Sequence, residues 1–82
     1  MDYEVSFRPK ALKDLDSLQP GTARRVVEKT TRLKNDLEGD VKRLTNHSPE
    51  YRLRVGDYRV LFEVEGNQII VYHVKHRREA YR

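Results

Sequence analysis

The sequence contains no cysteine and no tryptophan, and it has only three histidines. Without cysteine the chain has no disulfide, no thiolate nucleophile and no cysteine-ligated zinc site. The three histidines do not have the spacing of a familiar metal site, so we predict neither a metal ion nor another cofactor. A Gly-rich phosphate-binding loop is also missing. These absences leave arginine, histidine and tyrosine side chains as the groups available for chemistry.

Long apolar segments are absent as well. No run approaches the roughly 18 residues of a membrane span, and the N-terminus lacks the basic and apolar regions of a signal peptide. Hydrophobic and charged residues each make up 37% of the 82 residues, which fits one compact domain with a modest core. We therefore expect a single soluble domain over residues 1–82, located in the cytoplasm and without a membrane partner.

The net charge of +4 is unevenly distributed along the chain. Residues 1–40 hold 8 basic and 8 acidic side chains, whereas residues 41–82 hold 9 and 5. A basic surplus in one part of a domain is typical of proteins that bind a polyanion such as nucleic acid. Small proteins that bind no nucleic acid are often basic too, so the charge alone leaves both interpretations open.

The apolar pattern along the chain is first strand-like, then helical, then strand-like again. Alternating apolar residues predict strands, and apolar residues three and four apart predict helices. The predicted elements are a strand at 3–7, a helix at 9–18, a helix from Pro20 or Thr22 to Gly39, a loop at 40–50, and strands at 51–56, 58–65 and 68–74.

The order β-α-α-β-β-β predicts an α+β fold, with two N-terminal helices packed on one face of a mostly antiparallel four-stranded sheet. The opposite face is then open to a ligand. The register of the last strand stays open. A two-residue loop at Gly66 and Asn67 directs His73 toward the core, whereas a three-residue loop directs it to the other face.

Three arginines are predicted to share one face of a hairpin whose two-residue turn is Gly56 and Asp57. In that register Arg54 pairs with Arg59, and Arg52 points to the same side. Guanidiniums packed side by side repel one another, so they are best explained by a partner with several negative charges. The alternative is a basic face that is merely solvated.

Such a face carries groups suited to cleaving RNA. The ribose 2′-OH attacks the adjacent phosphorus if a base takes its proton, cations stabilise the charge on the phosphate oxygens, and an acid protonates the leaving 5′ oxygen. Neither metal nor water is required. The permanently charged guanidiniums of Arg52, Arg54 and Arg59 suit the stabilising role.

His76 is the candidate acid or base, because an imidazole exchanges protons near neutral pH and this residue adjoins the C-terminal basic cluster. A histidine at a strand end is otherwise often inert. We interpret His73, within an apolar strand, as structural. His47 lies in a loop that can approach a substrate, but we favour a structural role for it too.

Other polar residues are weaker candidates. Tyr81 can stack on a base, donate its hydroxyl or cap the core near the chain end. Arg77 and Arg78 belong to a charge run of a kind that is usually solvated, although it shares a segment with Tyr81. Lys42 and Arg43 are candidate phosphate contacts.

Two segments have distinctive sequences that can be compared with those of known protein families. They are Tyr51-Arg52-Leu53-Arg54-Val55-Gly56-Asp57-Tyr58-Arg59-Val60-Leu61-Phe62 and His76-Arg77-Arg78-Glu79-Ala80-Tyr81-Arg82. Together they resemble the RelE branch of the RelE/ParE toxin superfamily, over nearly the whole chain. Members of that branch are toxins of bacterial and archaeal toxin-antitoxin pairs that cut mRNA in the ribosomal A site. The resemblance implies a RelE-like fold and a metal-independent endoribonuclease.

The resemblance also implies roles for individual side chains. It assigns phosphate and substrate contacts to Arg52 and Arg54, transition-state stabilisation to Arg59 and Arg77, and stacking or proton transfer to Tyr81. Well-known members carry lysines at the first two positions, and a lysine loses its proton more readily than an arginine. His76 is therefore the strongest candidate for proton transfer, and Arg78, Lys42 and Arg43 are expected to add phosphate contacts.

The implied partners are mRNA, the ribosome and a RelB-type antitoxin that holds the toxin inactive. An extended, acidic, amphipathic chain that folds on binding would neutralise the basic face. Two alternatives remain. One is a ParE-like toxin that poisons DNA gyrase by binding, against which the His76-to-Tyr81 ending argues. The other is an RNA-binding or ribosome-binding module without chemistry.

Overall fold

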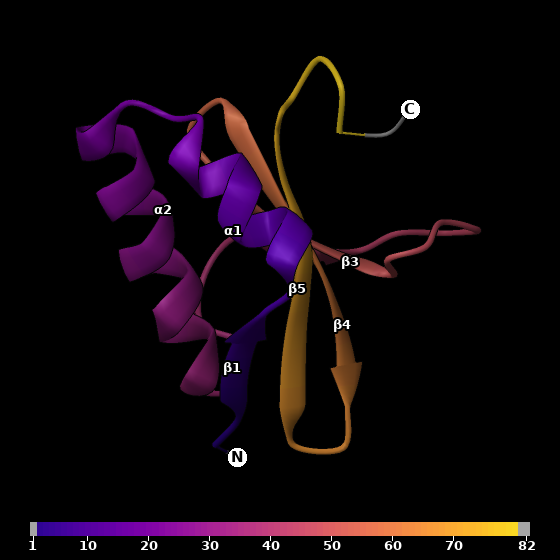
Figure 1. Cartoon of the computed structure of the whole chain (residues 1–82). Coiled ribbons are helices and arrows are strands. Elements are labelled where there is room, and N and C mark those ends of the chain that lie inside the picture. Colours follow the sequence, from indigo (N-terminus) through magenta and orange to yellow (C-terminus); the bar gives the residue numbers. More distant parts are fainter. Residues whose placement is uncertain (1, 81–82) are drawn as a thin grey trace.

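The computed structural model describes residues 2–80, in which two helices lie together on one side of a five-stranded sheet (Figure 1). The predicted α+β class is confirmed. The strand order across the sheet is β1-β5-β4-β3-β2, and only the β1–β5 pair is parallel. The elements are β1 (Glu4–Phe7), α1 (Pro9–Asp16), α2 (Pro20–Thr31), the 3-10 turn η1 (Arg32–Lys34), β2 (Val41–Arg43), β3 (Tyr51–Val55), β4 (Tyr58–Glu65) and β5 (Gln68–His76). Within residues 2–80, neither helix is long and apolar enough to span a membrane.

Both helices begin at a proline, Pro9 in α1 and Pro20 in α2. At the first helical position the missing N–H has no intrahelical partner to lose, and the fixed φ suits a helix. The predicted extension of the second helix to Gly39 was wrong. Asp36 and Leu37 adopt φ values of 57° and 61°, which a right-handed helix cannot contain, so the chain turns back toward the sheet after η1.

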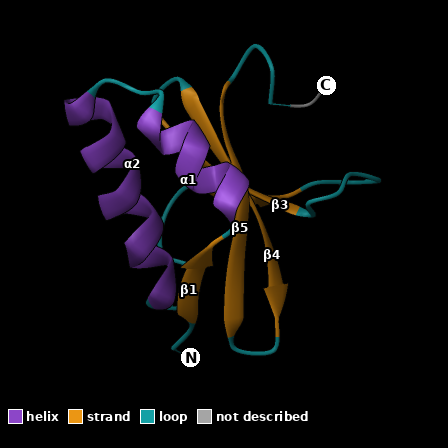
Figure 2. Ribbon diagram, in the orientation of Figure 1, coloured by secondary structure: helices purple, strands orange, loops and turns teal. Residues whose placement is uncertain are grey.

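The fifth strand, β2, occupies part of the segment predicted as a loop. Val41 pairs with Leu53 and Lys42 with Arg52, which makes β2 an edge strand beside β3. Three residues are too few for an alternating pattern to be recognised, so the predictions of a 40–50 loop and of four strands were both wrong here. The rest of the segment is a loop that projects from the sheet (Figure 2).

The β4–β5 connection is a two-residue loop. Gly66 and Asn67 form it, and Val64 lies opposite Ile69. This is the first of the two registers considered from the sequence. Continued without interruption, that register would direct His73 toward the core.

A β-bulge at Tyr72 reverses the directions of the side chains that follow it. Phe62 pairs with Val71, but Leu61 pairs with His73, so Tyr72 has no partner on β4. Because side chains alternate along a strand, one unpaired residue exchanges the two faces for the rest of β5. His73 therefore shares the face of Leu61, away from the core, although the loop has two residues.

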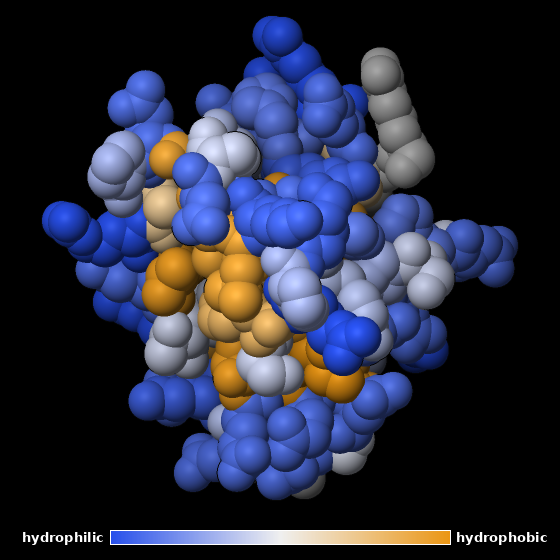
Figure 3. Space-filling model, in the orientation of Figure 1, coloured by the Kyte–Doolittle hydropathy of each residue, from blue (hydrophilic) through white to orange (hydrophobic). Residues whose placement is uncertain are grey.

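The main core lies between the sheet and the helices. Its buried residues are Ala11, Val26, Leu33, Leu53, Val55, Val60, Phe62, Ile69, Val71 and Val74. Figure 3 shows apolar side chains that also reach the surface over the helices and β1. Leu12 of α1 is 50% exposed and Val27 of α2 is 38% exposed. We call these two residues the helix patch.

The carboxylate of Asp14 in α1 completes the hydrogen bonding of β5 where β1 has ended. Its Oδ2 accepts a bond of 2.9 Å from the backbone N–H of Val74, and Lys10 pairs with its Oδ1. Only 11% of the Asp14 side chain is exposed. Helix α1 thus satisfies a strand donor that would otherwise have no partner in the sheet.

Replacing Asp14 with alanine should destabilise the fold by about 1–3 kcal/mol, because a partly buried N–H would lose its acceptor. Urea unfolding measures this change. Asp14→Asn keeps an oxygen acceptor and should cost clearly less. Equal losses in the two variants would show that the Val74 hydrogen bond is not the source of the stability.

Candidate functional site

Basic side chains from adjacent strands form two cross-strand rows on the face away from the core. In one row Arg54 of β3 lies opposite Arg59 of β4, which lies opposite Lys75 of β5. In the next row Lys42 of β2 lies opposite Arg52 of β3. Directly opposed residues point to the same side, which confirms the predicted common face of the three hairpin arginines. Lys75 was missed, because its pairing depends on the bulge.

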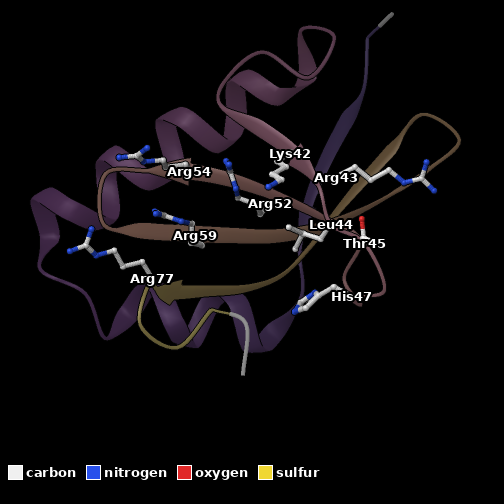
Figure 4. A pocket seen from close by; sticks show the side chains of 9 residues that line it. All are labelled: Lys42, Arg43, Leu44, Thr45, His47, Arg52, Arg54, Arg59 and Arg77. Atoms are coloured by element: carbon white, nitrogen blue, oxygen red, sulfur yellow. The ribbon is translucent and has the colours of Figure 1, made fainter.

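This face is hollowed where the loop after β2 rises beside it (Figure 4). The hollow has a volume of about 630 Å³, and its lining contains six basic side chains and no carboxylate. We call it the basic hollow. Its lining residues are Lys42, Arg43, Leu44, Thr45, His47, Arg52, Arg54, Arg59 and Arg77. Cations gathered around an open hollow produce a field that attracts a polyanion.

Two of these arginines are held in place by hydrogen bonds. Arg59 Nη1 donates to the carbonyl oxygens of Gly56 at 2.9 Å and of Tyr58 at 3.0 Å. Arg52 Nη1 donates to the backbone oxygen of Asp40 at 2.7 Å and to its Oδ1 at 3.2 Å. Asp40 offsets part of the charge of Arg52, whereas the neutral carbonyl partners of Arg59 do not cancel its charge. Arg59 is thus a fixed cation, as electrostatic stabilisation of a transition state requires.

Other cations of the hollow are able to reorient. Lys42 and Arg54 are exposed, and neither makes a hydrogen bond or ion pair with another side chain of residues 2–80. The backbone N–H of Arg77 donates to the Asp57 carbonyl at 2.8 Å, but its Nε lies 3.9 Å from Asp57 Oδ1, a loose contact. These three side chains can adjust to a ligand without breaking strong bonds.

Arg43 contributes less to the hollow than predicted. Its side chain points away from the other cations in Figure 4 and pairs with Glu50 at 2.9 Å. This hydrogen bond, with the charge of Glu50, raises the pKa of Arg43 above its ordinary value. Arg78 is exposed but does not line the hollow, and Tyr81 lies outside the described residues.

His76 does not lie on the basic face, and the expectation that it belongs to the same site was wrong in this respect. It pairs with Tyr58, whose side chain packs against the core, and the two rings meet edge to face with centroids 5.5 Å apart. Its Nδ1 accepts a hydrogen bond of 3.3 Å from the backbone N–H of Arg78. The bulge at Tyr72 is the cause, because it exchanges the faces of the residues that follow.

His47, set aside in the sequence analysis, does line the basic hollow. Its ring extends from the loop after β2 on the side of the hollow across from Arg54 and Arg77 (Figure 4). Loop residues have no periodicity, so the sequence alone gave no direction for this side chain. One sequence feature could have indicated a place in the site. His47 lies four residues before the start of the strand that carries Arg52, in a segment with Ser48 and Pro49.

His73 occupies a partly dehydrated position on the same sheet face but does not line the hollow. Its Nδ1 is buried and has no hydrogen-bond partner in the described part of the chain. Desolvation is the main cause that lowers the pKa of His73 below its ordinary value. The charges of Lys75 and Lys10 lower it further, and Asp14 opposes them. The fold therefore favours the neutral ring.

This lowered pKa predicts a pH dependence of stability. The unfolded chain binds a proton at this histidine near pH 6.5, where the folded protein resists it, so the free energy of unfolding should fall as the pH drops below about 6.5. Urea unfolding at about pH 7.5 and pH 5.5 measures the fall. It should be smaller in His73→Gln, and equal falls in the two proteins would contradict the assignment.

Among residues 2–80, no group of three or more histidine, aspartate and glutamate side chains is arranged to hold a metal ion. The groups in the basic hollow that can interact with a ligand are thus cations, one imidazole and the Thr45 hydroxyl. Such a set can bind phosphate groups through charge-assisted hydrogen bonds.

Comparison with known proteins gives consistent relatives. Residues 5–81 match the family model described as the ParE toxin of type II toxin-antitoxin systems. Toxin RelE3 of Methanocaldococcus jannaschii is 34% identical, with 95% of this chain and 94% of that protein covered. A chain of the archaeal RelE-RelB complex of Pyrococcus horikoshii has a TM-score of 0.77 and 31% identity. The match covers 98% of this chain and 100% of that chain. A chain of the RelBE2 toxin-antitoxin complex of Mycobacterium tuberculosis has a TM-score of 0.81 and 27% identity. The match covers 94% of this chain and 100% of that chain.

Proposed function

Because the chain belongs to the RelE/ParE superfamily and is a RelE-family toxin of the type II toxin-antitoxin class, we propose that it cleaves mRNA on the ribosome. The substrate is mRNA in the A site, and cleavage inhibits translation in the cytoplasm. The observation that carries this proposal is the basic hollow, whose lining contains six basic side chains and no carboxylate and which is open to a phosphodiester backbone.

The proposed reaction is the attack of a ribose 2′-OH on the adjacent phosphorus. As the bond to the 5′ oxygen breaks, negative charge gathers on the non-bridging oxygens, and cations fixed beforehand stabilise it best. Arg59 fits this role because its guanidinium is held by two carbonyl oxygens. Arg77, Arg54 and Lys42 are free to close around the flanking phosphates, and Arg52 supports the hollow through Asp40.

We also propose a RelB-type antitoxin as the physiological partner. Structures of similar toxins contain RelB partners, and this chain offers two surfaces that would suit one. An acidic segment would neutralise the basic hollow, while an amphipathic helix would cover the helix patch at Leu12 and Val27. Binding over the hollow would exclude RNA.

A second candidate rests on the family model itself, whose description names ParE toxins. In that case the chain would bind DNA gyrase and cut no RNA. The two functions differ in target, so one pair of assays separates them.

The deciding experiment is primer extension on a defined mRNA, free or programmed in ribosomes, with a gyrase supercoiling assay in parallel. We expect cuts within A-site codons that need ribosomes and are suppressed by the purified antitoxin. Growth arrest on expression, together with an intact message and inhibited supercoiling, would instead favour the gyrase target. Binding to ribosomes without cuts or gyrase inhibition would indicate the non-catalytic module.

A further inference from the structure

The proposed cleavage needs a base that removes the 2′-OH proton, and the arginines of the basic hollow do not provide one. A guanidinium keeps its proton at any physiological pH, so the arginines of the hollow cannot serve. A lysine ammonium is also ordinarily protonated, whereas an imidazole exchanges protons near neutral pH. His47 is the only imidazole among the lining residues of the basic hollow within residues 2–80.

The orientation of His47 suits this task. Its Nδ1 lies 2.8 Å from the backbone carbonyl oxygen of Pro49. A carbonyl oxygen can only accept a hydrogen bond, so Nδ1 must carry the proton and donate. In the neutral ring the lone pair is then on Nε2, the nitrogen that a general base requires.

One hydrogen bond joins the two ends of the loop that carries His47, and another ties its second end to the sheet. The Leu44 N–H donates to the Glu50 carbonyl at 2.6 Å, and the Glu50 N–H donates to Glu63 Oε1 of β4 at 2.9 Å. Pro49 is buried. These bonds hold the imidazole at a fixed place on the rim, as precise proton transfer needs.

We propose that His47, and not His76, removes the 2′-OH proton; this inference rests on the proposed mRNA cleavage. Nε2 of His47 takes the proton as the 2′ oxygen bonds to phosphorus. The bond from phosphorus to the 5′ oxygen breaks, and that oxygen takes a proton from solvent water, which the open hollow admits. The products are a 2′,3′-cyclic phosphate and a 5′-hydroxyl, and His47 then returns its proton to solvent.

The test uses the full-length toxin with ribosomes carrying end-labelled mRNA, in single-turnover reactions. His47→Asn is the informative variant, because its side-chain amide can still donate to the Pro49 carbonyl but has no counterpart of Nε2. We expect its cleavage rate to fall by about 10²–10⁴-fold. Affinity for ribosomes whose mRNA has a 2′-deoxy nucleotide at the cut position should be unchanged. Added imidazole should partly restore cleavage by His47→Ala.

His76→Asn is the matched control, since it removes a histidine from the opposite face of the sheet, and it should cleave at nearly the wild-type rate. Thermal unfolding of each variant checks its fold. A His47→Asn rate within about threefold of wild type would overturn the proposal. So would a loss of affinity as large as the loss of rate, which would make His47 a binding contact. A wild-type protein that cuts no mRNA would refute the proposed function itself.

Discussion

Arg59→Ala is expected to reduce the rate of mRNA cleavage by about 10²–10³-fold, the usual loss when one fixed transition-state donor is removed. Its guanidinium is part-buried and held by the Gly56 and Tyr58 carbonyls, so its position is set before the substrate arrives. Exposed cations such as Arg54 must be ordered at the moment of binding and should matter less to the chemical step. Single-turnover cleavage on programmed ribosomes measures the effect.

Two comparisons separate this role from net charge and from folding. Arg24→Ala removes the same charge from the exposed surface of α2 and should leave the cleavage rate nearly unchanged. Arg59→Lys keeps the charge but loses the planar fork, so an intermediate rate is expected. If Arg24→Ala slowed cleavage as much as Arg59→Ala, charge attraction to the ribosome would explain the result, and the specific role of Arg59 would be wrong.

Phe62→Ala should destabilise the protein by about 3–5 kcal/mol, as removal of a buried aromatic ring usually does. Phe62 is fully buried in the middle of β4, and its ring stacks on Tyr51 with centroids 5.5 Å apart and planes 17° apart. A small domain has a total stability of about 5–15 kcal/mol, so this loss is a large share of it. Urea unfolding followed by circular dichroism measures it.

Leu12→Ala provides the comparison for this prediction, because it removes an apolar side chain that is 50% exposed in the helix patch. We expect a loss below about 1 kcal/mol there. Phe62→Leu should fall between the two, since it fills part of the space. A Phe62→Ala variant as stable as Leu12→Ala would mean that the two layers repack around the missing ring.

The arginine hairpin could be predicted from the sequence because its turn residues and the alternation of apolar and polar residues along its strands indicate the same register. Gly56 at φ 58° provides the positive φ that a two-residue turn needs, and the pairing of Arg54 with Arg59 follows from it. With the register fixed, the common face of these arginines follows from alternation alone.

The face of His76 could not be predicted in the same way. Counted from the Gly66-Asn67 loop without a bulge, His76 falls on the basic face beside the arginines. The unpaired Tyr72 moves it to the core side. Bulges depend on packing across the whole sheet, and no local residue pattern in β5 predicts this one.

The position of His47 in the loop after β2 could not be predicted either. A structural role was favoured for it from the sequence, and its direction is set by the Pro49 carbonyl and by the Glu50–Glu63 hydrogen bond. The second of these contacts joins residues 13 positions apart in the sequence, which are close only in the fold. Short-range sequence patterns therefore predicted the side-chain directions on the strands of the site but not those in its loop.

The bulge has a last consequence, for how this chain can vary in length. If Tyr72 were deleted, Val71 would be followed directly by His73, and β4 and β5 could form an uninterrupted ladder. Leu61 would still face His73, and the core residues beyond it would keep their partners. The strand thus carries one residue more than its pairing needs. A relative with one residue fewer at this position can have the same core and the same basic rows, so an alignment gap there signals no change of site.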